Sequence, residues 1–120
     1  AVWRYDLCDI QVVQLTSYAQ GDFFAWHKDT GEGPYGPESR PEWQGLVRKL
    51  SVTLLLSSQD ECDGGEFQIK DEYGHVWRDP GFLERGSAII FPSNLLHQVQ
   101  PVTAGKRLSA VAWALGPPMR

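Results

Sequence analysis

Short segments rich in β-branched and apolar residues, each bounded by turn-forming residues, constrain the fold of this chain more than any other feature. Several of them alternate between apolar and polar residues, as strands with one buried face do. Glycine, proline or acidic residues separate the segments, and no stretch shows the periodicity of an amphipathic helix. About eight such segments predict an all-β fold with few or no helices, a sandwich or jelly roll. The expected strands span residues 9–18, 23–29, 48–58, 65–71, 86–93, 96–102 and 106–115, with a short return strand from residue 76.

The composition limits the class of protein and its partners. The 120 residues fit one small domain, and their 42% hydrophobic and 12% aromatic content is enough for a packed core. The net charge of −4 argues against nucleic acid or an anionic membrane as the main partner. No signal peptide or membrane-spanning run is visible, and Cys8 and Cys62 match no zinc motif. We therefore expect a cytoplasmic protein with reduced thiols; the sequence indicates no oligomeric state.

His27 and Asp29, near the end of the second expected strand, are the first candidates for a functional site. Residues i and i+2 of a strand point to the same face, so these side chains would lie side by side. Two imidazoles and one carboxylate form the ligand set of non-haem Fe(II) oxygenases, and the third ligand must come from a distant strand. We expect that ligand to be His97, which follows a buried strand and a turn, rather than His75 in a hairpin turn.

Arg107 follows His97 by ten residues, in the otherwise apolar last strand. A guanidinium that points into the core without an anion is costly, whereas its planar fork matches a carboxylate. A metal with three protein ligands leaves positions open, and a 2-oxo acid would fill two of them while its far carboxylate pairs with a cation. Arg107 is the candidate for that cation; the alternative is an arginine that simply faces solvent.

Together these residues resemble the prolyl 4-hydroxylase-like (PKHD-type) branch of the 2-oxoglutarate/Fe(II)-dependent dioxygenases. The resemblance rests on YAQGDFFAWHKD (18–29), DGGEF (63–67) and HQVQPVTAGKR (97–107), and covers nearly the whole chain. It implies a double-stranded β-helix, a cupin-like jelly roll, with residues 1–120 as a single catalytic domain. Relatives usually carry additional N-terminal helices outside the sheet, and few residues precede the first expected strand here.

The resemblance also implies an activity and roles for individual residues. The activity is hydroxylation of a C–H bond, with prolyl residues of a protein or peptide as the first choice of substrate, coupled to conversion of 2-oxoglutarate to succinate and CO2. The cofactors and co-substrates are Fe(II), 2-oxoglutarate and O2, with ascorbate as a supporting reductant. His27, Asp29 and His97 would bind iron, while Arg107 and Tyr18 would hold 2-oxoglutarate. Four further residues would line the pocket: Trp113, Ser51, Thr53 and Leu55.

The segment 30–45, dense in glycine and proline, excludes a regular strand or long helix and begins directly after Asp29. We interpret it as a lid or binding loop, with Tyr35, Arg40 and Trp43 as candidates to contact the substrate. Two other functions remain open. A cupin-like metalloenzyme without a 2-oxo acid predicts no role for Arg107, and a non-catalytic jelly-roll binding module does not require the three candidate ligands to converge.

Overall fold

The computed structural model describes residues 5–11, 14–31, 33–58, 60–78 and 84–118, and this part of the chain is almost entirely strand and loop. It contains eleven β-strands, one short 3-10 helix and no α-helix. The expectation of an all-β chain with few or no helices is thereby confirmed. The elements are β1 (Asp9–Ile10), β2 (Gln14–Tyr18), β3 (Phe24–His27), η1 (Pro41–Trp43), β4 (Val47–Leu55), β5 (Cys62–Gly64), β6 (Phe67–Lys70), β7 (Val76–Trp77), β8 (Ala88–Pro92), β9 (Leu96–Val99), β10 (Val102–Gly105) and β11 (Arg107–Gly116).

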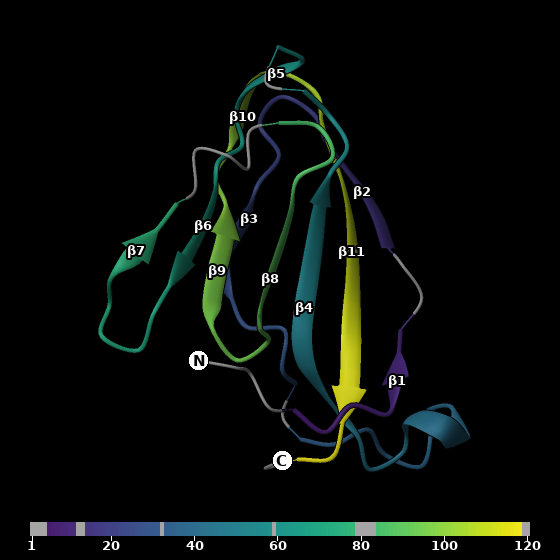
Figure 1. The fold of residues 1–120 in the computed structure, drawn as a ribbon. Helices are drawn as coiled ribbons and strands as arrows, with labels where there is room; N and C mark the ends of the chain where they lie inside the picture. The colour runs from purple at the N-terminus through teal and green to yellow at the C-terminus, as the bar shows by residue number, and fades with distance from the viewer. Residues whose placement is uncertain (1–4, 12–13, 32, 59, 79–83, 119–120) are drawn as a thin grey trace.

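Two antiparallel sheets form the body of the molecule (Figure 1). In the larger sheet, β11 pairs with β4 on one side and with β1 and β2 on the other, and β8 pairs with β4. The second sheet has the order β3-β9-β6-β7, and the two-stranded β5-β10 ribbon lies at the top of the view in Figure 1. β2 and β4 flank β11 in this sheet, so inward side chains of the three strands face the same side.

The core lies between these sheets, and both sheets contribute to it. Alternation along the strands decides which residues enter it, since successive side chains point to opposite faces. In β4 the inward face carries Ser51, Thr53 and Leu55, which are all buried. In β11 the inward face begins with Arg107, only 3% exposed, and includes the buried Trp113. The main apolar cluster consists of Tyr18, Leu55, Phe67, Phe91, Val99 and Val102.

Several expected boundaries change in the structure. The expected strand 23–29 is shorter, since β3 ends at His27. No strand was expected between residues 58 and 65, but this segment contains β5, which pairs with β10. Most of β10 lies beyond the expected strand 96–102. Such short strands are stabilised by their partner rather than by their own pattern, so sequence periodicity does not reveal them. Residues 12–13, inside the expected strand 9–18, lie outside the described residues. Within the described ranges, no helix has the length and apolar character needed to cross a membrane.

Candidate metal centre and its cavity

His27, Asp29 and His97 converge on one point. Each of the three side chains offers a ligand atom, and these atoms all lie within 4.8 Å of one another. Asp29 Oδ1 lies 3.1 Å from His97 Nε2 and 3.5 Å from His27 Nε2. Two imidazole nitrogens and one carboxylate oxygen suit a first-row divalent metal, so the donor set fits the ion that the sequence predicts.

The pairing of β3 with β9 brings the two histidines together. His27, the last residue of β3, is the direct register partner of His97 on β9. The sequence pattern predicted Asp29 on the same strand, but in the structure it lies beyond the end of β3. Its position is set instead by its backbone N–H, which donates to the carbonyl of Ser93 at 3.0 Å. The three candidate ligands therefore come from one strand pair and a bend fastened to the β8–β9 turn.

The rings of both histidines are held with Nε2 toward the metal centre. Nδ1 of His27 lies 2.7 Å from the carbonyl oxygen of Ala25, and Nδ1 of His97 lies 2.9 Å from that of Leu95. A hydrogen bond from Nδ1 to a carbonyl fixes the tautomer and leaves the Nε2 lone pair free for a metal. Burial lowers the pKa of His27, but its hydrogen bonds with Asp29 and Ala25 outweigh this effect, and the net pKa is raised.

Asp29 stays ionised although its carboxylate is largely buried. Burial alone would raise the pKa of this carboxyl group, but hydrogen bonds from His27, His97 and Ser51 hold it far below its usual range. Its second oxygen, Oδ2, accepts hydrogen bonds from Ser51 Oγ at 2.5 Å and from Trp113 Nε1 at 3.0 Å. Asp29 therefore offers a negatively charged oxygen to a metal ion.

Arg107 is a buried cation in the same cavity. Its guanidinium lies 5.7 Å from the centre of the Tyr18 ring, its register partner in β2. Among the described residues, no ion pair includes Arg107. Burial lowers its pKa, and this is opposed by the nearby Tyr18 and Cys62. A buried guanidinium without a carboxylate partner is unfavourable by itself, which makes this place suited to an anionic ligand.

A cavity of about 350 Å³ connects the metal centre with Arg107. Three residues predicted to hold the co-substrate or line the pocket, Tyr18, Thr53 and Trp113, are part of its lining, together with His27, Asp29, His97 and Arg107. The other lining residues were not expected: Gln14, Thr16, Phe24, Lys28, Arg48, Phe67, Phe91, Val99, Ser109 and Val111. Of these, Ser109 and Val111 lie at every second position between Arg107 and Trp113 and so share their face of β11. That spacing could have predicted both residues from the sequence.

Arg48 places a second cation at the cavity wall. Its guanidinium carbon lies 3.7 Å from the centre of the Trp113 ring, and its Nε donates to Gln11 Oε1 at 2.7 Å. The amide of Gln11 in turn donates to the hydroxyl of Tyr35. The position of Arg48 at the start of an apolar strand could have suggested from the sequence that it has a functional role. Nothing in the sequence indicated the stacking partner, because Arg48 and Trp113 are far apart in the chain.

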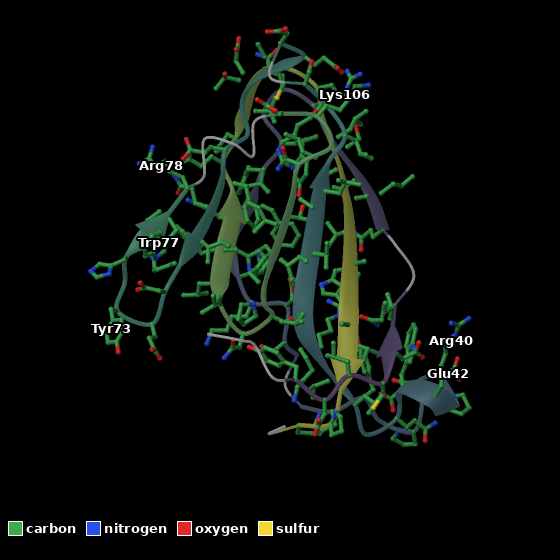
Figure 2. The ribbon with its side chains drawn as sticks, in the orientation of Figure 1. Arg40, Glu42, Tyr73, Trp77, Arg78 and Lys106 are labelled. Carbon is green, nitrogen blue, oxygen red and sulfur yellow. The ribbon has the colours of Figure 1, made fainter. Side chains whose placement is uncertain are left out.

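The other predicted pocket residues lie outside the cavity lining. Ser51 is fully buried behind Asp29, and Leu55 belongs to the apolar core. Tyr35 and Trp43 pack against each other, with ring centroids 5.9 Å apart, and the indole N–H of Trp43 donates to Asp9 Oδ2. Arg40 stacks over Trp43 at the η1 end of the molecule (Figure 2). Whether these three contact a substrate stays a prediction.

His75 is separate from the metal centre. It lies in the hairpin between β6 and β7, where its side chain is 73% exposed and its Nδ1 lies 3.4 Å from Asp71 Oδ2. Tyr73 and Trp77 of the same hairpin are labelled in Figure 2 and project from the second sheet. The structure thus brings His97, and not His75, to His27 and Asp29.

Comparison with known proteins identifies the family. The family model of the 2OG-Fe(II) oxygenase superfamily matches residues 13–115, which include all three candidate ligands and Arg107. The chain belongs to this superfamily. The resemblance noted in the sequence is confirmed by relatives named PKHD-type hydroxylases. One from Shewanella oneidensis is 41% identical over 97 residues, covering 80% of this chain and 39% of that protein.

Another relative agrees with this assignment, and two solved structures share the fold. A PKHD-type hydroxylase of Psychrobacter sp. is 36% identical over 101 residues, covering 82% of this chain and 36% of its own length. The chain thus spans well under half the length of these relatives. A Pseudomonas putida prolyl-4-hydroxylase superposes with a TM-score of 0.64 at 23% identity, over 90% of this chain and 53% of that one.

A Trichoplax adhaerens prolyl hydroxylase, solved with a hypoxia inducible factor peptide fragment, is also similar in fold. Its TM-score is 0.67 at 16% identity, and the match covers 90% of this chain and 44% of that one. At these identities the likeness concerns the fold. The jelly-roll architecture expected for a 2OG-Fe(II) oxygenase is therefore confirmed.

Proposed function

We propose that this 2OG-Fe(II) oxygenase domain binds Fe(II) and 2-oxoglutarate and hydroxylates a C–H bond, with release of succinate and CO2. One observation carries the proposal: three ligand atoms within 4.8 Å of one another share a cavity with a buried arginine that no carboxylate of the described residues pairs with. A metal site alone would suit many proteins. A metal site combined with an unsatisfied buried cation suits a chelating anion with a second, distant carboxylate.

One end of the cavity would bind the metal and the other end the far carboxylate of 2-oxoglutarate. His27, Asp29 and His97 would hold Fe(II), which supplies open coordination positions where a 2-oxo acid and O2 react. Arg107 would pair with the far carboxylate of 2-oxoglutarate, and the Tyr18 hydroxyl beside it would donate a further hydrogen bond. The aromatic side chains of Phe24, Phe67 and Phe91, with Trp113, would exclude water from the reacting groups. Ascorbate would keep the iron reduced.

For the substrate we propose a prolyl residue of a protein or peptide. Two observations support this choice: the relatives are named hydroxylases, and the similar structures include prolyl hydroxylases, one of them solved with a peptide. The cavity offers Arg48 beside Trp113 at its wall, where spare guanidinium N–H groups can donate to peptide carbonyls. Residues 1–120 would act as one catalytic domain.

The test is succinate formation and peptide hydroxylation in one reaction. The protein is incubated with Fe(II), ascorbate, 2-oxoglutarate and a library of proline-containing peptides, and mass spectrometry searches for peptides that gain one oxygen atom. His97→Ala and Arg107→Ala should both lose succinate formation. Arg78→Ala is the matched control, because this arginine is 66% exposed in an ion pair with Glu66, away from the cavity.

The same reaction separates the alternatives. Succinate formation that survives in Arg107→Ala would show that 2-oxoglutarate is used without this arginine. Peptide oxidation without succinate formation, unchanged in Arg107→Ala, would favour a cupin-like metalloenzyme that uses no 2-oxo acid. A protein that binds metal yet converts neither 2-oxoglutarate nor any peptide would favour a binding module. Hydroxylation at a residue other than proline would support the proposed dioxygenase activity but show that the proposed prolyl substrate is wrong.

A further inference from the structure

Ser51 on β4 and Ser93 in the turn after β8 are both fully buried, with 0% exposed surface. Neither lines the cavity, and burial of a hydroxyl group is unfavourable unless the group is hydrogen-bonded. Their hydroxyl oxygens lie 2.8 Å apart, and Ser51 Oγ lies 2.5 Å from Oδ2 of Asp29. Two buried hydroxyl groups thus form a chain that ends on a candidate metal ligand.

The chemistry of the groups fixes the direction of this chain. An ionised carboxylate only accepts hydrogen bonds, so the single proton of the Ser51 hydroxyl must be donated to Asp29. The contact between the serines therefore has Ser93 as donor and Ser51 as acceptor. Hydrogen bonds aligned in one direction polarise one another, so the Ser93 hydroxyl strengthens the bond from Ser51 to Asp29.

Ser93 also holds the backbone of the ligand. Its carbonyl accepts the N–H of Asp29 at 3.0 Å, and its own N–H donates to the carbonyl of Lys49 on β4 at 3.0 Å. The main chain and the side chain of Asp29 are therefore fastened to the same residue, one directly and the other through Ser51. A substitution that removes only the Ser93 hydroxyl leaves the backbone bonds in place.

These contacts distinguish the two oxygens of Asp29. Oδ2 accepts from Ser51 and from Trp113 Nε1, whereas Oδ1 faces Nε2 of both histidines. We propose that Ser51 and Ser93 are positioning residues, whose relay holds Oδ2 away from the metal so that Asp29 offers Oδ1 alone. A carboxylate that binds through one oxygen leaves one more position open than a carboxylate that binds through two. This inference rests on the proposed function, because it requires the three residues to bind a metal.

Binding of Co(II) to the protein, without 2-oxoglutarate, tests the relay. Titration followed by visible absorption gives both the affinity and the coordination of the ion. Ser51→Ala should bind Co(II) about 10–100-fold more weakly, the usual effect of losing a group that orients a ligand, and its absorption bands should change shape. Ser93→Ala should lose less, since Ser51 still donates to Asp29. Ser51→Thr, which keeps the hydroxyl, should restore the absorption spectrum of the parent.

Ser57→Ala is the matched control. Ser57 follows β4, is 1% exposed, and its hydroxyl accepts the N–H of Leu108 at 3.1 Å. This variant removes an equally buried serine hydroxyl six residues along the chain from Ser51, beyond the end of β4. It should lower the thermal unfolding midpoint while Co(II) affinity and spectrum stay those of the parent.

The double variant tests whether the serines act in series. Because Ser93 acts on the carboxylate through Ser51, Ser51→Ala/Ser93→Ala should bind Co(II) as Ser51→Ala does, without a further loss. Parent-like binding and spectra in Ser51→Ala would overturn the relay while leaving the metal site intact. Should Ser51→Ala not fold, parent-like binding and spectra in Ser93→Ala would overturn it. Absence of Co(II) binding by the parent protein would instead refute the proposed function.

Discussion

His27 and His97 are direct partners across β3 and β9, and the centres of their rings lie 4.1 Å apart. Direct partners on adjacent antiparallel strands are the closest pair that a sheet can present on one face. Since the Nδ1 atoms of both rings are bound to backbone carbonyls, both Nε2 atoms face the carboxylate of Asp29. The sheet itself therefore builds two thirds of the proposed metal site.

Removing one histidine should remove metal binding. We expect His97→Ala to weaken Mn(II) binding by more than the roughly 100-fold that loss of a supporting hydrogen bond can cost, because a ligand itself is lost. Electron spin resonance of free Mn(II) measures the affinity. His75→Ala is the control, since this histidine is 73% exposed and far from the cluster in the β6–β7 hairpin. Equal losses of Mn(II) affinity in both variants would contradict the proposal that His97 is a metal ligand.

Metal affinity should fall in mild acid. The pKa of His27 is raised, because its hydrogen bonds with Asp29 and Ala25 outweigh the opposing effect of burial. The protonated ring is thus favoured in the metal-free fold, and a metal must displace that proton. Below the raised pKa, affinity should drop about tenfold per pH unit for each proton displaced. Mn(II) titrations from about pH 8 to 5.5 bracket the ordinary histidine value of ~6.5.

The stability of the metal-free protein should change with pH in the opposite direction to its metal affinity. A raised pKa of His27 stabilises the fold fully below the ordinary histidine value, and this contribution is lost as the pH rises through the raised value. Unfolding midpoints of the metal-free protein at each pH therefore show whether the fold persists where binding is weak. Affinity that stays constant over the range, in a folded protein, would argue against histidine ligands.

The sequence predicted those parts of the fold and site that local patterns encode. An apolar run identified β4 and alternation identified β6 and β11. The spacing of His27 and Asp29 gave a pair of potential ligands that the structure brings together, with Asp29 beyond the end of β3. The same alternation placed Arg107 and Trp113 on one face of β11, where the structure finds both at the cavity. Each of these inferences needs only neighbours in the chain.

What the sequence could not predict depends on pairing between distant segments. The β5–β10 ribbon is stabilised by its partner, and the register that sets His27 opposite His97 appears only when β3 meets β9. Ser93 acts through its place in a turn, which no local pattern reveals. The contact of Arg48 with Trp113 likewise arises from the pairing of β4 with β11.

The loop around η1 gives a prediction about stability. Trp43 packs on Tyr35 and donates to Asp9, and it does not line the cavity. Trp43→Ala should lower the free energy of unfolding by about 1–3 kcal/mol, through lost packing and one hydrogen bond, and leave 2-oxoglutarate affinity unchanged. Urea denaturation and ligand titration measure the two effects. A raised KM for a peptide substrate would support the predicted substrate contact of this loop.

Gly65 should control the position of Arg107. Its φ of +65° suits glycine, and a Cβ there would lie 3.0 Å from Arg107 Cδ and 3.0 Å from Val102 Cγ2. Gly65→Ala should therefore displace the guanidinium and weaken 2-oxoglutarate binding, while Mn(II) affinity stays that of the parent. Gly74→Ala is the control, because this glycine also has a positive φ of +84° but no atom near its Cβ. Equal effects of both variants would mean that backbone strain alone is responsible.

Arg107 itself gives the most direct test of the co-substrate. It is 3% exposed and without a carboxylate partner among the described residues, so Arg107→Ala should leave the metal site intact. Losing a charge-assisted pair in a desolvated pocket costs about 2–5 kcal/mol, or roughly 30- to several-thousand-fold in affinity for 2-oxoglutarate. Arg107→Lys should lose less, because it keeps the charge without the planar fork.

The decisive comparison is between two ligands of the same variant. Titration of Arg107→Ala with Mn(II) should match the parent, while titration of the Mn(II)-loaded variant with 2-oxoglutarate should show the large loss. Arg78→Ala, which removes an exposed arginine, should change neither value. If Arg107→Ala binds 2-oxoglutarate as well as the parent does, the buried cation does not recognise the far carboxylate. Arg107 would then be a buried arginine that takes no part in binding the co-substrate.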